Sequence, residues 1–193
     1  FNKDINSWNT SNVVYMSAVF SGATSFNQPL DNWQTNKVKT MEDLFNGATS
    51  FNQNINNWDV SKVQDTSYKP GSGLFSGATS FNQPLDNWQT ISLVDAKWMF
   101  SGATSFNKDI SSWSTDNVVE VAGMFKGATS FNQDISDWNV GNVKNFGSFY
   151  DGMFASATSF NKNINSWNTS SATSMESIFD NATSFNQPLD NWD

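Results

Sequence analysis

Residues 23–33 read ATSFNQPLDNW, and the same eleven residues return at 78–88 and at 182–192. The shorter block ATSFN occurs seven times along the chain. Counted from the phenylalanine of the block, full repeats begin at residues 1, 26, 51, 81, 106, 131 and 160, and a partial eighth covers residues 185–193. A period near 25 residues predicts one domain of stacked repeat units rather than several independent domains.

Each repeat has two halves, and positions are counted here from its first phenylalanine. The first half, as in Phe1 to Trp8, carries Phe at position 1, Asn at 2, Ile or Leu at 5 and Trp at 8. The second half carries apolar residues at 13, 16, 19 and 20, a spacing typical of one helix face, with Gly22 as a candidate C-cap. We therefore expect a short strand around Ile5, then a short helix.

Such units, stacked so that parallel strands align on one side and helices on the other, would form an α/β solenoid. The connection rule for parallel strands predicts a right-handed superhelix. The seven full repeats and the partial eighth would then be a segment of a longer array, since neither end shows a polar capping unit, and bare ends would favour end-to-end self-association.

Composition excludes several classes of function. The chain has no cysteine and no histidine, the usual ligands of zinc, haem and iron–sulfur centres, and we expect neither a cofactor nor a catalytic residue. The net charge of −8, with no arginine, argues against nucleic-acid partners. No apolar run approaches the roughly 20 residues of a membrane span.

The recurring pattern A-T-S-F-N-Q, then Trp, Val, Met-Phe and Gly, resembles the BspA-like leucine-rich-repeat surface proteins, in particular a short Phe/Trp-rich branch of unknown function. The resemblance covers the whole chain and departs from the pattern at Thr66, Ala96 and Ala172. It implies an extracellular or cell-surface location and a non-catalytic role in adhesion or in binding protein or matrix. A glycan-binding module and a subunit of an extracellular filament are the alternatives.

Two sets of recurring residues are candidate sites. The recurring tryptophans are predicted to form a core layer, with an exposed carbohydrate-stacking ladder as the alternative. The asparagines at position 2 are predicted to form a structural ladder that bonds successive repeats or closes a turn. The ladder comprises Asn27, Asn52, Asn82, Asn107, Asn132 and Asn161.

Acidic and aromatic residues supply the other candidates. Acidic residues of the first half are best explained by a solvated polar face, and divalent-cation binding by Asp109, Asp134 and Asp137 is the weaker alternative. Both insertions carry aromatic residues, and Trp98 occupies position 18, which should face solvent. These residues either form an exposed interaction patch or fold over their own loops. The patch would comprise Tyr68, Trp98, Phe149 and Tyr150.

Overall fold

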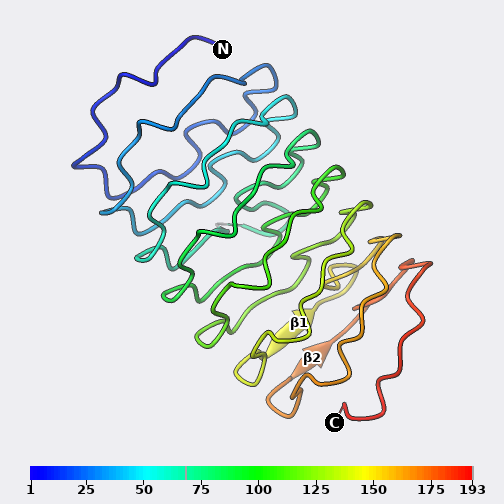
Figure 1. The fold of residues 1–193 in the computed structure, drawn as a ribbon. Coiled ribbons are helices and arrows are strands. Elements are labelled where there is room, and N and C mark those ends of the chain that lie inside the picture. The colour runs from blue at the N-terminus through cyan, green and yellow to red at the C-terminus, as the bar shows by residue number, and fades with distance from the viewer. Residues whose placement is uncertain (68, 193) are drawn as a thin grey trace.

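The structure is a computed structural model that describes residues 1–67 and 69–192. The chain winds into a stack of irregular loops, one for each repeat, that runs from the N-terminus at one end to the C-terminus at the other (Figure 1). We call each loop a rung. The rungs lie side by side in chain order, so residues about 25 apart in sequence become neighbours in space.

Regular secondary structure is nearly absent. The two strands are β1 (Asn145–Gly147) and β2 (Ser174–Met175), which pair in parallel, Asn145 with Ser174 and Gly147 with Met175. Elsewhere, single parallel bridges join position 15 of successive rungs into a column one residue wide. The bridges run Tyr15–Thr40, Thr40–Asp65, Asp65–Asp95, Asp95–Glu120 and Glu120–Asn145.

The prediction of an α/β solenoid with one strand and one helix in each repeat is wrong. Within residues 1–67 and 69–192 there is no helix, and the parallel pairing lies at position 15 instead of around Ile5. At Ile5 the carbonyl instead accepts the backbone N–H of Trp8 across a turn, at 3.0 Å.

The physical reason is where the backbone donors point. In a helix each N–H bonds a carbonyl four residues earlier in the same segment. Here alternate N–H groups from Met16 to Gly22 donate to carbonyls of the next rung, at 2.7–3.1 Å. Positive φ angles of 58° at Ala18 and 70° at Gly22 also break any helical path. The segment instead makes four-residue turns, such as the one closed by the Ser21 N–H, which donates to the Ala18 carbonyl. Such turns bury every third or fourth residue and so imitate a helix period.

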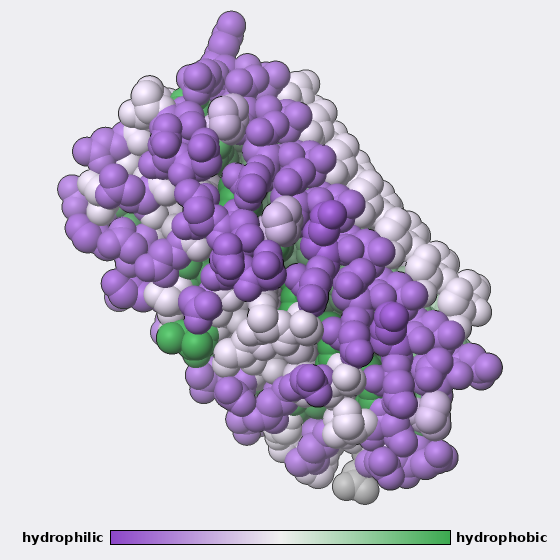
Figure 2. Space-filling view, in the orientation of Figure 1, coloured by the Kyte–Doolittle hydropathy of each residue, from purple (hydrophilic) through white to green (hydrophobic). Residues whose placement is uncertain are grey.

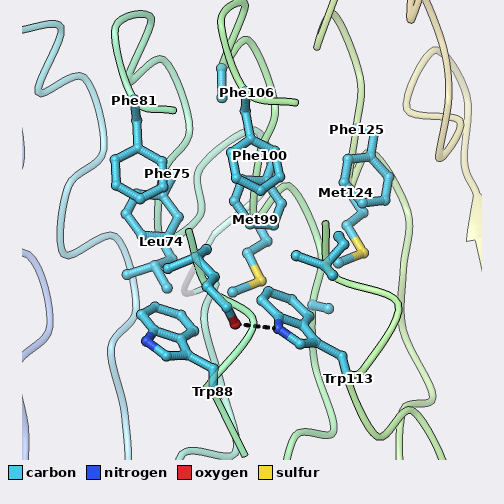
Figure 3. Packing of buried hydrophobic residues seen from close by; sticks show 14 of the residues in the cluster. Leu74, Phe75, Phe81, Trp88, Met99, Phe100, Phe106, Trp113, Met124 and Phe125 are labelled. Atoms are coloured by element: carbon cyan, nitrogen blue, oxygen red, sulfur yellow. Dashed lines mark hydrogen bonds between the residues drawn. The ribbon is translucent and has the colours of Figure 1, made fainter. Parts of the chain in front are cut away.

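The core is built from stacked aromatic columns. The ring at position 20 of one repeat stacks on the ring at position 1 of the next repeat, as Phe75 does on Phe81 with centroids 4.1 Å apart. Rings at each of these two positions also stack on their counterparts in the following rung, which gives two continuous columns (Figure 3). Trp88 and Trp113 stack at 6.1 Å in a third column. The tryptophans from Trp33 to Trp167 are buried, which confirms the core prediction for them, whereas Trp8 in the first rung is 58% exposed.

The buried Nε1–H of Trp98, at position 18, has no partner in the described residues, but each buried indole at position 8 has a fixed polar partner. Its Nε1–H donates to the position-5 carbonyl of the preceding rung, as Trp113 does to Leu85 at 3.0 Å (Figure 3). The same bond recurs from Trp33 to Trp192 at 3.0–3.2 Å. A buried indole N–H needs such an acceptor, and here the acceptor sets the register between rungs.

Candidate functional site

The asparagines at position 2 lie in a continuous ladder along one edge of the stack. The side-chain Oδ1 of each accepts the backbone N–H of the next, as Asn107 accepts from Asn132 at 3.0 Å. Seven such bonds, 2.9–3.0 Å long, run from Asn2 to Asn186. Where position 3 is glutamine, its Nε2–H reaches the same oxygen, as from Gln133 to Asn107 at 2.8 Å. The ladder therefore bonds successive rungs. Where the next rung has glutamine at position 3, the asparagine oxygen accepts two hydrogen bonds.

The candidate carboxylates Asp109 and Asp134 lie at position 4 and cap a turn. Asp134 Oδ1 accepts the backbone N–H of Ser136 at 3.0 Å, and Asp109 accepts that of Ser111 at 2.8 Å. These backbone bonds, reinforced by the serine hydroxyls, hold the pKa of each carboxyl below its ordinary value. Both groups therefore stay ionised near neutral pH, which does not suit a general acid.

The third acidic candidate, Asp137, is exposed at position 7. In the described part of the chain, no three Asp or Glu side chains gather closely enough to hold a metal ion. The structure therefore does not assemble Asp109, Asp134 and Asp137 into a cation site.

Rungs differ in how they make this turn, a feature that the sequence analysis did not identify. Some carry Asp or Asn at position 4, and others carry proline there. Before each proline rung, position 6 is asparagine, and its Oδ1 accepts the position-7 N–H of the proline rung at 3.0 Å. The pairs are Asn6 with Asn32, Asn56 with Asn87, and Asn165 with Asn191. Comparing positions 4 and 6 between adjacent repeats would have revealed the pairing.

Two open grooves lie on this polar face, each centred on a rung with Asn at both positions 4 and 6. The larger holds about 500 Å³ and is centred on Asn54 and Asn56. The smaller holds about 350 Å³ and is centred on Asn163 and Asn165. Much of the visible surface is hydrophilic, with a neutral strip along one edge (Figure 2). The grooves are recesses with hydrogen-bonding walls on an otherwise shallow surface.

Trp98 does not face solvent, contrary to the expectation for position 18. It is 5% exposed and adopts a positive φ of 50°. The equivalent residues of the neighbouring rungs are glycines, Gly73 and Gly123. A Cβ on Gly73 would lie 2.5 Å from the Trp98 carbonyl oxygen, and one on Gly123 would lie 2.4 Å from the indole Cδ1. Gly123 thus leaves the slot that holds the indole, whereas Gly73 allows the backbone of its rung to lie close to that of Trp98.

Phe149 and Tyr150 do not form one exposed patch with Trp98, because Trp98 is buried. Phe149 and Tyr150 are 73% and 63% exposed, and their rings contact each other at 4.1 Å. They project from the second insertion as a pair. Tyr68 lies outside the described residues.

Acidic side chains also line the position-15 column. Asp65 is followed there by Asp95 and Glu120, and Lys97 lies 2.6 Å from Asp95 and 3.5 Å from Glu120. Burial, and then the charge of Asp95, raise the pKa of the Asp65 carboxyl above its ordinary value. The lysine neutralises part of this column but reaches Asp65 only through longer-range attraction.

Comparison with protein families gives a match over the whole length of the chain. A family model described as Mycoplasma protein of unknown function, DUF285, matches residues 1–70, 70–152 and 148–193. No curated protein and no solved structure matches. In the described residues, no helix has the length and apolar character to cross a membrane.

Proposed function

The chain belongs to the DUF285 family of Mycoplasma proteins of unknown function, and we propose that it acts as a non-catalytic scaffold, displayed at the cell surface or secreted, that binds protein or matrix. The resemblance of its repeats to BspA-like surface proteins supports this location and role.

One observation carries the proposal: the recurring large side chains turn inward, and the outward positions vary. Phe51, Ile55 and Trp58 are at most 2% exposed, and their counterparts from the second to the seventh rung are similarly buried. The outward positions 3, 4, 6 and 7 change from rung to rung between amide, hydroxyl, carboxylate, lysine and proline. A constant core with a variable exterior is how stacked repeats present a binding surface.

The acids of this face support a non-catalytic role. A carboxylate pair used for acid–base chemistry needs one member with a raised pKa. Asp109 and Asp134 both have lowered pKa values and are held by backbone donors in the same type of turn. Neither carboxyl therefore has the raised pKa that the general acid of such a pair needs.

Two measurements test the proposal. Antibodies against the chain should label intact, unpermeabilised source cells, and labelling that requires permeabilisation would contradict a surface role. The purified chain should bind immobilised extracellular-matrix extract in a saturable way, whereas the heat-denatured chain serves as the control. Turnover of a chromogenic glycoside panel by the native chain would contradict the non-catalytic assignment.

A further inference from the structure

We infer that the two grooves are equivalent binding sites for uncharged, hydroxyl-rich ligands, which means neutral oligosaccharides. This inference specifies a ligand class for the proposed scaffold and rests on that proposal. It depends on three observations. Both grooves are centred on a rung with Asn at positions 4 and 6 and a proline rung after it, they offer free hydrogen-bond donors and acceptors, and no cationic side chain is among their lining residues.

The same three-rung arrangement builds both grooves. The central rung has Asn at positions 4 and 6, the following rung has proline at position 4, and the preceding rung contributes one carboxylate. That carboxylate comes from a different position in each groove: it is Asp31, at position 6, in the larger groove and Asp134, at position 4, in the smaller. The grooves are four rungs apart, and the position-1 rings of these successive rungs lie 5.9–6.1 Å apart, so the groove centres are separated by about 24 Å.

Structural bonds hold these side chains but leave binding groups free. In the larger groove, Asn54 Oδ1 accepts the backbone N–H of Asn56 at 2.9 Å, so its Nδ2 remains a free donor. Asn57 donates its Nδ2–H to the Asp31 carbonyl at 2.6 Å, so its Oδ1 remains a free acceptor. Asp31 Oδ1 accepts from Asn6 at 2.8 Å, and its Oδ2 has no partner among the described residues. The groove thus offers a donor and two acceptors that are already ordered.

These groups select a ligand by chemistry. A sugar hydroxyl donates one hydrogen bond and accepts others, so neighbouring hydroxyls match a free amide N–H beside a free carboxylate or amide oxygen. No Lys is among the lining residues of either groove, and each has an acid. The charge of Lys162 partly offsets that of Asp134 beside the smaller groove, so an anionic ligand would be repelled most strongly at the larger one. The larger groove has a single apolar side chain in its wall, Pro29, too little to hold a hydrophobic ligand.

Two such sites on one face also favour a polymer over a monomer. A chain that occupies both grooves gains from the high effective concentration at the second site. We therefore expect weak binding of a monosaccharide and tighter binding of a long oligosaccharide that reaches both grooves.

The repeats themselves supply the variant that tests this. Asp stands at position 4 in other rungs, as Asp109 does, and makes the same turn. The double substitution Asn54→Asp with Asn163→Asp therefore keeps the cap oxygen and removes the free donor from both grooves. Adjacent acids at position 4 already occur in the chain, at Asp109 and Asp134. The matched control is the double substitution Asn12→Asp with Asn168→Asp, which adds the same charge outside both grooves and keeps the oxygens that accept from Lys37 and Ser170.

The probes are chitohexaose, cellohexaose and mannohexaose, with a heparin hexasaccharide as the sulfated counterpart, titrated calorimetrically and by NMR. At least one neutral probe should bind and shift the side-chain amide signals of Asn54 and Asn57. The double variant should bind it about tenfold or more weakly, from one lost hydrogen bond at each site, and the control should match the unmodified chain.

The inference is overturned if no neutral probe binds, if the heparin fragment binds more tightly than every neutral probe, or if the double variant binds like the unmodified chain. Matrix binding that survives the double substitution and enzymatic removal of matrix glycans would also overturn it, and would point to a protein ligand. That last result would leave the scaffold proposal intact, so the two failures can be told apart.

Discussion

The slot around Trp98 makes a sharp prediction for Gly123→Ala. The new Cβ would lie 2.4 Å from the indole Cδ1 and 2.6 Å from its Nε1, closer than any carbon tolerates. The buried indole has little room to move, so overpacking should cost about 1–3 kcal/mol. The φ of +65° at Gly123 adds about 1 kcal/mol for a residue with a Cβ. The expected total loss in the free energy of unfolding is about 2–4 kcal/mol.

A double-mutant cycle isolates the clash from the backbone term. Trp98→Ala should itself cost about 3–5 kcal/mol through the cavity it leaves. In that background Gly123→Ala no longer meets an indole, so its cost should fall to about 1 kcal/mol. The two substitutions should therefore be non-additive by about 1–3 kcal/mol.

The assay is urea unfolding followed by fluorescence of the other tryptophans. The matched control is Gly127→Ala, because Gly127 has a nearly identical φ of +66° but its Cβ would approach nothing closer than 3.8 Å. Its cost should be about 1 kcal/mol in either background. Costs of Gly123→Ala and Trp98→Ala that add to within about 0.5 kcal/mol would refute the slot as described.

Other substitutions probe the ladder and the two kinds of acid. Asn107→Ala should cost about 1 kcal/mol because Asn132 N–H loses its acceptor, and Asn107→Asp should cost less because an oxygen remains; equal losses in urea unfolding would contradict the ladder. Asp65→Asn should raise the melting temperature at pH 7, because the raised pKa means that ionised Asp65 destabilises the fold. That gain should vanish below pH 3.8, where the acid is protonated in both states; a loss at pH 7 would count against it. Asp134→Ala should show the opposite dependence. Its lowered pKa contributes stability above the ordinary value of 3.8 that disappears as pH falls through the folded value, so the variant should differ from the parent at pH 7 and converge with it in strong acid.

The candidate site was only partly predictable. The sequence identified the polar positions of the first half as outward-facing variation, but Asp109 and Asp134 were candidates for a metal site because a turn cap and a ligand use the same carboxylate. Each proline rung follows a rung with asparagine at position 6, whose Oδ1 accepts the position-7 N–H of the proline rung. Comparison of adjacent repeats shows this pairing of Asn6, Asn56 and Asn165 with proline rungs, but the sequence analysis missed it. Trp98 could not be placed from its own position, because its indole fits only where the next rung has a glycine, Gly123, at the same position.

The sequence by itself determined that the chain repeats with a period near 25 residues and which side chains form the core, since only a stack of equivalent rungs needs Phe, Ile or Leu, and Trp at the same places every time. The tertiary structure alone decided the backbone path. Apolar spacing at 13, 16 and 20 fits both a helix and a series of four-residue turns. Which of the two forms depends on where the backbone N–H groups find acceptors. Between rungs those acceptors lie within 2.7–3.1 Å of Met16 to Gly22, so the backbone bonds its neighbour instead of itself, and no helix forms in the described residues.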